Sequence, residues 1–259
     1  MIEKETRIRR EPPPFRRVVV MEAENVTGWL RRITIGGPEL SGMETADPAA
    51  SVRLLLPGAD GLVIPAWNGN EFLLPGGSRP ILRTMTPRYQ SARSLAIDVV
   101  LHEVGAASDW ARTASIGSEV AVSGPGRGSA PDPGNGPLLI AGDQAAVPAV
   151  CQLLENLPAR VRIDVLIETD HPDDPAPLPD RPDAAVRWLA HAGGTPPGTE
   201  LVAAVEKADL TDGVRVWAAG EAAAMQRIRR HLSERGVPRA HTTVRGYWKH
   251  GKVAGGTGA

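Results

Sequence analysis

The chain has 259 residues, enough for one large domain or two of ordinary size, and its 42% hydrophobic and 23% charged residues are typical of a soluble globular protein. Its 29 lysines and arginines nearly cancel its 30 aspartates and glutamates. This charge balance gives no indication of nucleic acid as a partner. The early apolar run VVVM is too short for a signal-peptide core, and nothing approaches the ~18 apolar residues of a membrane span. We therefore expect a cytoplasmic protein that does not insert into a membrane.

Strand patterns dominate the first half of the chain. Short apolar runs that end at Pro, Gly or a charged residue are typical of strands in an antiparallel barrel or sandwich. A helix is expected over residues 105–114, because Gly, Ala and Ser open a helical pattern there. The strands are expected at residues 16–25, 28–37, 51–57, 81–87, 94–103 and 118–125.

The stretch GPGRGSAPDPGNGP, residues 124–137, is rich in Gly and Pro and is typical of a linker. Its glycines precede a strand instead of following one, so the G-x-G-x-x-G dinucleotide mechanism does not apply to them. The linker divides the chain into an expected barrel domain at 15–130 and a second domain at 137–251. Flexible tails are expected at 1–14 and 252–259.

Beyond the linker, strands alternate with helices, which predicts a mostly parallel sheet with helices on both faces. The strands are expected at 138–142, 161–169, 184–190, 214–220 and 241–248. The helices are expected at 148–157, 198–208 and 221–236. The predicted architecture is an antiparallel β-barrel joined to an α/β domain.

Several kinds of chemistry are disfavoured by the residues. A single cysteine, Cys151, excludes an internal disulfide and a cysteine-ligated iron–sulfur cluster. The six histidines are scattered without an H-x-x-x-H pair, so we expect no dedicated metal site. Neither a G-x-S-x-G nor a G-x-x-x-x-G-K-[ST] motif is present, which disfavours serine-hydrolase and P-loop chemistry.

The stretch RTMTPR, residues 83–88, places two arginines and two threonines around a methionine in a predicted strand. A salt-bridged surface would explain these polar residues, and so would an anionic cofactor lying across the strand. Three other stretches end a strand with small residues before a helix, at 97–114, 140–150 and 217–221. Helix starts favour anions such as a pyrophosphate, although many α/β folds have such turns without a ligand.

Five segments in this order resemble the siderophore-interacting proteins, which are FAD-dependent ferric-siderophore reductases of the ferredoxin-reductase-like superfamily. The segments are RTMTPR, DVVLHEVGAASDWARTASIGSEVAVSGPGRG, LLIAGDQAAVPAVCQLLENLP, VWAAGE and RGYWKHG. The resemblance covers roughly residues 15–251. It implies a flavin-binding β-barrel followed by a nicotinamide-binding α/β domain.

The resemblance also implies which residues hold FAD. The family motif is Arg-x-Tyr-Thr, which Arg83 and Thr86 keep, while Met85 takes the tyrosine position and Thr84 the variable one. Arg83 would pair with the pyrophosphate, since its planar fork suits a phosphate, and Thr86 would bind the flavin portion. The residues expected beside the isoalloxazine are Val99, Val100 and Leu101. Those expected at the pyrophosphate and adenosine side are His102, Gly105, Ala107 and Ser108.

In the second domain, AGDQAAVPA resembles the nicotinamide-side turn of the family, which usually has the sequence AGDETALPA. Gln144 and Ala145 replace a Glu and a Thr, which leaves the choice between NADPH and NADH open. The residues implied on this side are Gly142, Asp143 and Gln144, with Gly220 and Glu221 near the reactive face of the flavin.

A basic cluster at the open edge of the flavin would receive an anionic iron chelate. The matching positions are Arg53, Arg127 and Lys249, each of which would otherwise be a solvated surface cation.

The resulting prediction is a flavin-dependent oxidoreductase that moves electrons from NAD(P)H or another donor to ferric iron in a siderophore, releasing Fe(II). No side-chain acid, base or metal ligand is required. A flavoenzyme acting on an organic substrate in biosynthesis and a non-catalytic chelate-binding protein are the alternatives. The oligomeric state is left open.

Overall fold

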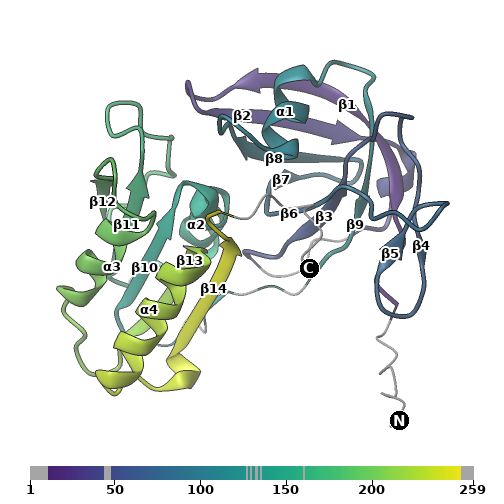
Figure 1. Ribbon diagram of the computed structural model, residues 1–259. Coiled ribbons are helices and arrows are strands. Elements are labelled where there is room, and N and C mark those ends of the chain that lie inside the picture. Colours follow the sequence, from purple (N-terminus) through teal and green to yellow (C-terminus); the bar gives the residue numbers. More distant parts are fainter. Residues whose placement is uncertain are drawn as a thin grey trace, which may run out of the picture.

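The computed structural model describes residues 11–43, 48–126, 128, 130–131, 134, 136–159 and 161–251. A curled antiparallel sheet and a parallel sheet flanked by helices form its two halves (Figure 1). Most of the expected tails, at 1–10 and 252–259, lies outside the described residues, as does Arg127.

The curled sheet has seven strands in the order β6, β3, β9, β1, β2, β8, β7, and all neighbours are antiparallel. Its strands are β1 (Arg16–Asn25), β2 (Leu30–Gly36), β3 (Val52–Leu55), β6 (Leu82–Met85), β7 (Pro87–Gln90), β8 (Ser94–Val100) and β9 (Glu119–Ser123). A separate hairpin pairs β4 (Ala66–Trp67) with β5 (Phe72–Leu73), and helix α1 spans Ala106–Thr113.

Alternation along the strands builds the core of this half. On β1, Val18 and Val20 are buried while the residues between and beside them are exposed or half-buried. They share one apolar cluster with Ile33 of β2 and Ile97 of β8. One face of each strand therefore fills a half-barrel, and the predicted antiparallel barrel class is confirmed.

The strand expected at 81–87 is two strands. Thr86 alone separates β6 from β7, and these strands form the two opposite edges of the sheet. The chain therefore crosses from one edge to the other at Thr86, within the RTMTPR stretch. Pro87 at the start of β7 lacks a backbone N–H, which suits a position at the beginning of an edge strand.

The second half is a five-stranded parallel sheet in the order β12, β11, β10, β13, β14. Its strands are β10 (Leu138–Asp143), β11 (Ile163–Thr169), β12 (Ala184–Ala190), β13 (Arg215–Glu221) and β14 (Thr242–Trp248). The helical segments are η2 (Gln144–Ala146), α2 (Val147–Asn156), α3 (Thr199–Glu206), α4 (Ala222–Glu234) and η3 (Arg239–His241).

Helices cover both faces of this sheet, as predicted. Leu138 and Ile140 of β10 pack in one cluster with α2, whereas Leu139 and Ala141 pack in another with α3 and α4. Successive residues of a strand point to opposite faces, so this division follows from the strand period.

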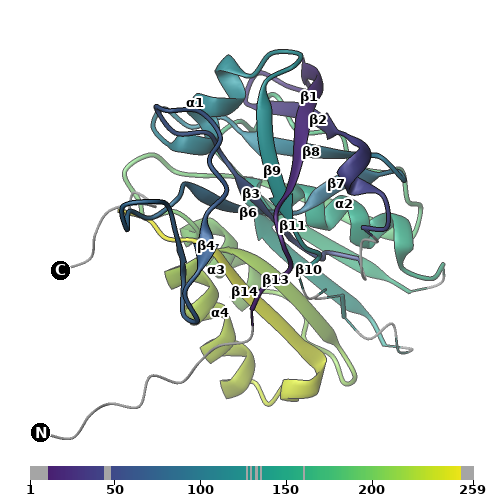
Figure 2. The same cartoon turned by 90° about the vertical axis from the view of Figure 1, so that its right-hand side faces the viewer.

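The α2 side of the parallel sheet faces the half-barrel (Figures 1 and 2). Trp29, Leu30 and Ala49 from the first half belong to the same apolar cluster as α2 and the parallel sheet. The Trp29 indole Nε1 also donates a 2.7 Å hydrogen bond to the carbonyl oxygen of Asp174. The two halves are therefore joined by a common core.

Within the described residues, no helix is both long enough and apolar enough to span a membrane.

Candidate functional site

The first segment of the candidate site is Arg83–Thr86. The guanidinium of Arg83 is partly buried and donates a 2.8 Å hydrogen bond to the carbonyl oxygen of Leu82. Desolvation by burial lowers the pKa of Arg83. Because burial disfavours the cation, an anion bound beside Arg83 would offset that cost.

The second segment, His102–Ser108, follows β8 and includes the start of α1. Met85 of the first segment and Leu101 and Ala107 beside or within the second pack against the same apolar cluster of the half-barrel. Both predicted flavin-binding stretches also lie beside the end of β14, where Tyr247 hydrogen-bonds Thr86 and the Trp248 ring lies 6.4 Å from the His102 ring. We call Arg83–Thr86 and His102–Ser108 together the barrel rim.

Ser108 shapes the rim from inside. Its hydroxyl donates to the carbonyl oxygen of Val100 at 3.1 Å and accepts from the backbone N–H of His102 at 3.0 Å, and the residue is buried. The hydroxyl hydrogen of Ser108 is therefore already used within the turn. What the turn offers a ligand is the backbone at the start of α1, where Gly105 is the N-cap and no side chain caps the helix.

The residues before the turn differ in what they can offer. The side chain of Val99 is buried in the core of the half-barrel, so only its backbone is available to a ligand. Val100 packs instead against the core shared by the two halves.

Facing the rim are the strand ends of the parallel sheet. We call Asp143, Glu168, Glu221 and Trp248, at the ends of β10, β11, β13 and β14, the sheet edge. Asp143 accepts hydrogen bonds from the Trp248 indole at 2.7 Å and from the backbone N–H groups of Glu221 at 2.8 Å and Ala145 at 3.0 Å. Burial raises the pKa of the Asp143 carboxyl to about 6, and these hydrogen bonds lower it in part.

Glu221 and Glu168 are likewise bound by the chain itself. Glu221 accepts from the N–H groups of Ala223 at 2.6 Å and Ala224 at 2.9 Å, which caps α4. Glu168 accepts from Gly198 at 2.6 Å and Leu201 at 2.7 Å at the start of α3.

Two glycines at the sheet edge make room for protein atoms. A Cβ on Gly142 would lie 2.7 Å from the Cβ of Ala146, and one on Gly220 would lie 2.5 Å from Oδ2 of Asp143. The small residues at these strand ends, taken from the sequence as a place for a ligand to approach, are thus required by packing within the chain.

Gln144 is buried at the same turn, and its amide Nε2 has no hydrogen-bond partner among the described residues. Its segment, η2, also contacts β8, the strand that leads into the rim. An acceptor atom on a bound ligand would satisfy this donor.

The end of β14 touches both parts of the rim. Tyr247 hydrogen-bonds Thr86, and burial of its hydroxyl raises the pKa of Tyr247 to about 12 although the ring remains partly exposed. The Trp248 ring lies 6.4 Å from the imidazole of His102. The sequence reasoning did not name these two aromatic residues. Their position at the end of the last parallel strand was the available signal.

Two of the three predicted substrate residues can be located. Arg53 is exposed on β3 and is paired in register with Thr84 of the rim. Lys249 is exposed and directly follows Trp248. Among the ion pairs of the described residues, none involves either cation.

The rim fits a dinucleotide such as FAD, because it combines a half-buried arginine, hydroxyl side chains and an uncapped helix start. The sheet edge offers less to a nicotinamide donor, because the carboxylates of Asp143 and Glu221 are engaged internally. Contacts there would come from Gln144 and from the backbone.

Comparison with known proteins supports this arrangement. A family model described as the siderophore-interacting FAD-binding domain matches residues 19–129, and one described as siderophore-interacting protein matches residues 137–251. An uncharacterized protein of Mycobacterium bovis, Mb2919c, is 37% identical over 196 residues, which cover 70% of this chain and 69% of that protein. The chain belongs to the siderophore-interacting protein family.

Two relatives of this siderophore-interacting protein carry more informative names. Ferric vibriobactin reductase ViuB of Vibrio cholerae is 29% identical over 235 residues, 86% of this chain and 85% of ViuB. The crystal structure of a siderophore utilization protein from T. fusca is 32% identical, with a TM-score of 0.81 over 93% of this chain and 96% of that one.

Proposed function

We propose that this siderophore-interacting protein is an FAD-dependent reductase that delivers electrons to ferric iron in a siderophore and releases Fe(II). The observation that carries the proposal is the meeting of the barrel rim with Tyr247 and Trp248 at the end of the parallel sheet. A relative named ferric vibriobactin reductase, aligned over most of both chains, supports the same reaction.

When bound, FAD would supply the chemistry of accepting two electrons as hydride from NADPH, NADH or another donor and passing them singly to two ferric ions. Arg83 would bind the pyrophosphate, together with the backbone at Gly105–Ala107. Thr86, already hydrogen-bonded to Tyr247, would orient the flavin end. Trp248, held by Asp143, would keep an aromatic surface at the junction, the place where the barrel rim meets the end of β14, and would exclude water from it.

The chelate would bind at the exposed cations beside this junction. Arg53 and Lys249 flank it on β3 and after β14, and Arg127, outside the described residues, is the third member by sequence. Positive charge here would attract anionic chelates at a distance, so turnover should slow as salt is raised. The electron donor would approach Gly142–Gln144 and Gly220, and a cytoplasmic location is part of the same proposal.

The test uses the FAD-loaded protein under anaerobic conditions. The flavin is reduced photochemically, a ferric siderophore is added, and both flavin absorbance and Fe(II) trapped by a colorimetric chelator are followed. The expected result is reoxidation with Fe(II) release at two irons for each reduced FAD. Reoxidation by an organic acceptor but by no ferric chelate would favour the biosynthetic flavoenzyme. Chelate binding by a protein that takes up no FAD would favour a chelate-binding protein.

A further inference from the structure

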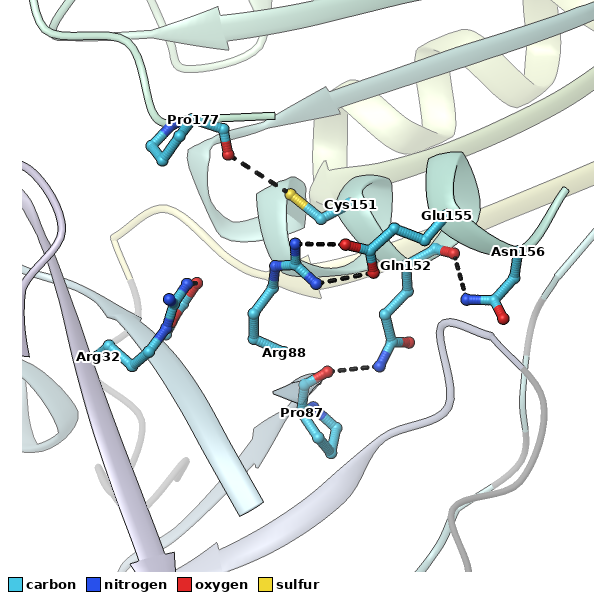
Figure 3. A network of polar contacts seen from close by, with 9 residues as sticks. Arg32, Pro87, Arg88, Cys151, Gln152, Glu155, Asn156 and Pro177 are labelled. Atoms are coloured by element: carbon cyan, nitrogen blue, oxygen red, sulfur yellow. Dashed lines mark hydrogen bonds and ion pairs between the residues drawn. The ribbon is translucent and has the colours of Figure 1, made fainter. Parts of the chain in front are cut away.

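A polar network ties β7 of the half-barrel to α2 of the second half (Figure 3). The guanidinium of Arg88 is bound by both carboxylate oxygens of Glu155, at 2.8 and 2.6 Å. One turn earlier on α2, the amide of Gln152 donates to the carbonyl oxygen of Pro87 at 2.5 Å and accepts from the N–H of Ala49 at 2.7 Å. We call Ala49, Pro87, Arg88, Gln152 and Glu155 the interdomain clamp.

The half-barrel end of the clamp is itself fixed. The Arg88 guanidinium lies 4.1 Å from the centre of the Tyr89 ring, and that of Arg32 lies 4.9 Å from the same ring. Arg32 is held in turn by Asp98, through bonds of 2.7 and 2.8 Å. The side chain of Arg88 is only 6% exposed, so its pair with Glu155 is largely shielded from water.

The other end of the clamp is fixed to the sheet edge. Helix α2 follows η2 without a break, and η2 begins at Gln144, where Asp143 binds the N–H of Ala145. A shift of α2 would therefore carry the Gly142–Gln144 turn with it.

On the rim side, the clamp residues are adjacent in sequence to the flavin segment. Pro87 and Arg88 come directly after Thr86, the last residue of the flavin segment. Separation of the two halves would break the Arg88–Glu155 pair and both hydrogen bonds of Gln152 together.

We propose that Gln152 and Glu155 are positioning residues that hold the flavin segment Arg83–Thr86 at a fixed separation from the Gly142–Gln144 turn. This inference rests on the proposed function, because the two segments it aligns are the proposed flavin and donor sides. Electron transfer would then proceed without an opening and closing of the two halves. The clamp acts through position alone and contacts neither cofactor nor substrate.

A distance measurement tests the inference without using activity. Exposed positions Ala92 and Asp212 are replaced by cysteine in the two halves and spin-labelled in the FAD-loaded protein. Cys151 stays unlabelled, because it is buried and burial raises the pKa of its thiol to about 11. The labelled parent should give one narrow distance distribution, and Glu155→Gln should broaden or shift it.

Asp183→Asn is the matched control. The Arg181–Asp183 pair is also bidentate, at 2.8 and 3.0 Å, and its side chains are 9% and 29% exposed against 6% and 36% for Arg88 and Glu155. It lies wholly within the second half, so its loss should lower the Tm without changing the distance. If Glu155→Gln fails to fold, Gln152→Ala takes its place in the measurement, because this substitution leaves no charged group without its partner.

The kinetic arm separates the two half-reactions. Flavin reduction by the donor should slow about tenfold or more in Glu155→Gln, because misplacement of reacting groups by about 1 Å is costly. FAD affinity should stay as in the parent, because Arg83 and Gly105–Ala107 all belong to the half-barrel, and Asp183→Asn should change neither half-reaction. An unchanged distance distribution in Glu155→Gln, or an unchanged rate of flavin reduction, would overturn the clamp. Failure of the parent to reduce ferric chelate would instead overturn the proposed function, and the distances would still decide this inference.

Discussion

The barrel rim and the sheet edge face each other across the candidate site, but they place charge in opposite ways. At the rim, the Arg83 cation is half-buried and α1 begins at Gly105 without a side-chain cap. At the sheet edge, buried carboxylates of Asp143, Glu168 and Glu221 bind the N–H groups at the start of each neighbouring helical segment.

This difference indicates that the two halves contribute differently to ligand binding. Helix starts carry partial positive charge that an anion can use only if no carboxylate is already there. The rim can therefore gain from a pyrophosphate, whereas the sheet edge has used the same interactions to fix its own turns. The α/β half then contributes rigid turns, an aromatic surface and the Gln144 donor, and it contributes little to anion binding.

The largest expected effect concerns the pH dependence of the sheet edge. The pKa of Asp143 is raised from its ordinary value of 3.8 to about 6 by burial, so the folded state holds the proton more tightly than the unfolded state. Stability from this group is present below pH 4 and is lost as the pH rises through about 6, by about 3 kcal/mol in all. Asp143→Asn cannot titrate, so the parent should lose stability relative to this variant between about pH 4 and 6. Urea unfolding of both proteins across that range measures it, and a constant difference would contradict the assignment.

The next effect concerns the rim. Arg83→Ala removes a charge-assisted contact worth about 1.5–3 kcal/mol, which is roughly ten- to a hundredfold in FAD affinity. FAD titration of the folded apoprotein measures the change, with Arg93→Ala on an exposed turn of the half-barrel as the control. Equal FAD affinity in Arg83→Ala and the parent would remove the pyrophosphate from this strand.

A smaller effect is expected at Glu221, where substitution should change the stability of the protein instead of its FAD affinity. Glu221→Ala removes the cap of α4 and should cost about 0.5–2 kcal/mol of stability while FAD affinity stays the same. Glu221→Gln, which keeps an acceptor oxygen, should recover part of the loss. Reduced FAD affinity with an unchanged Tm would instead make Glu221 a ligand contact and break the contrast between rim and edge.

Local pattern was sufficient to predict the fold because strand and helix periods are local properties. The strands at 16–25 and 184–190 have the predicted bounds. The split at Thr86 was missed because a single non-strand residue between two edge strands leaves the apolar pattern continuous. The hairpin of β4 and β5 was also missed, because two-residue strands have no measurable period.

The site is less accessible to sequence reasoning, because its contacts join distant parts of the chain. The hydrogen bond from Trp248 to Asp143 spans 105 positions, and the contact of Tyr247 with Thr86 crosses between the two halves. Ser108 illustrates the same limit. Its residue type suits a cap or an anion contact, and only the folded turn shows its hydroxyl bound to Val100 and His102.

The smallest expected effect concerns Met85, which stands where the family motif has tyrosine. Met85 lies on the rim strand one residue beyond Thr84 and packs partly against the core of the half-barrel. A tyrosine would stack on a flavin for about 0.5–1.5 kcal/mol beyond area burial, whereas a methionine sulfur contributes about 0.3–1.5 kcal/mol against the same ring.

Because these ranges overlap, Met85→Tyr should keep FAD and tighten it by less than about tenfold. What methionine cannot supply is a rigid planar π-face, so the flavin absorption spectrum should shift in the variant through new stacking. FAD titration and visible spectra of the two proteins provide the comparison, with Met21→Tyr on an exposed position of β1 as the control. A spectrum that does not change would place the flavin ring away from Met85, and the contact of Tyr247 with Thr86 would then mark the edge of the flavin site instead of its centre.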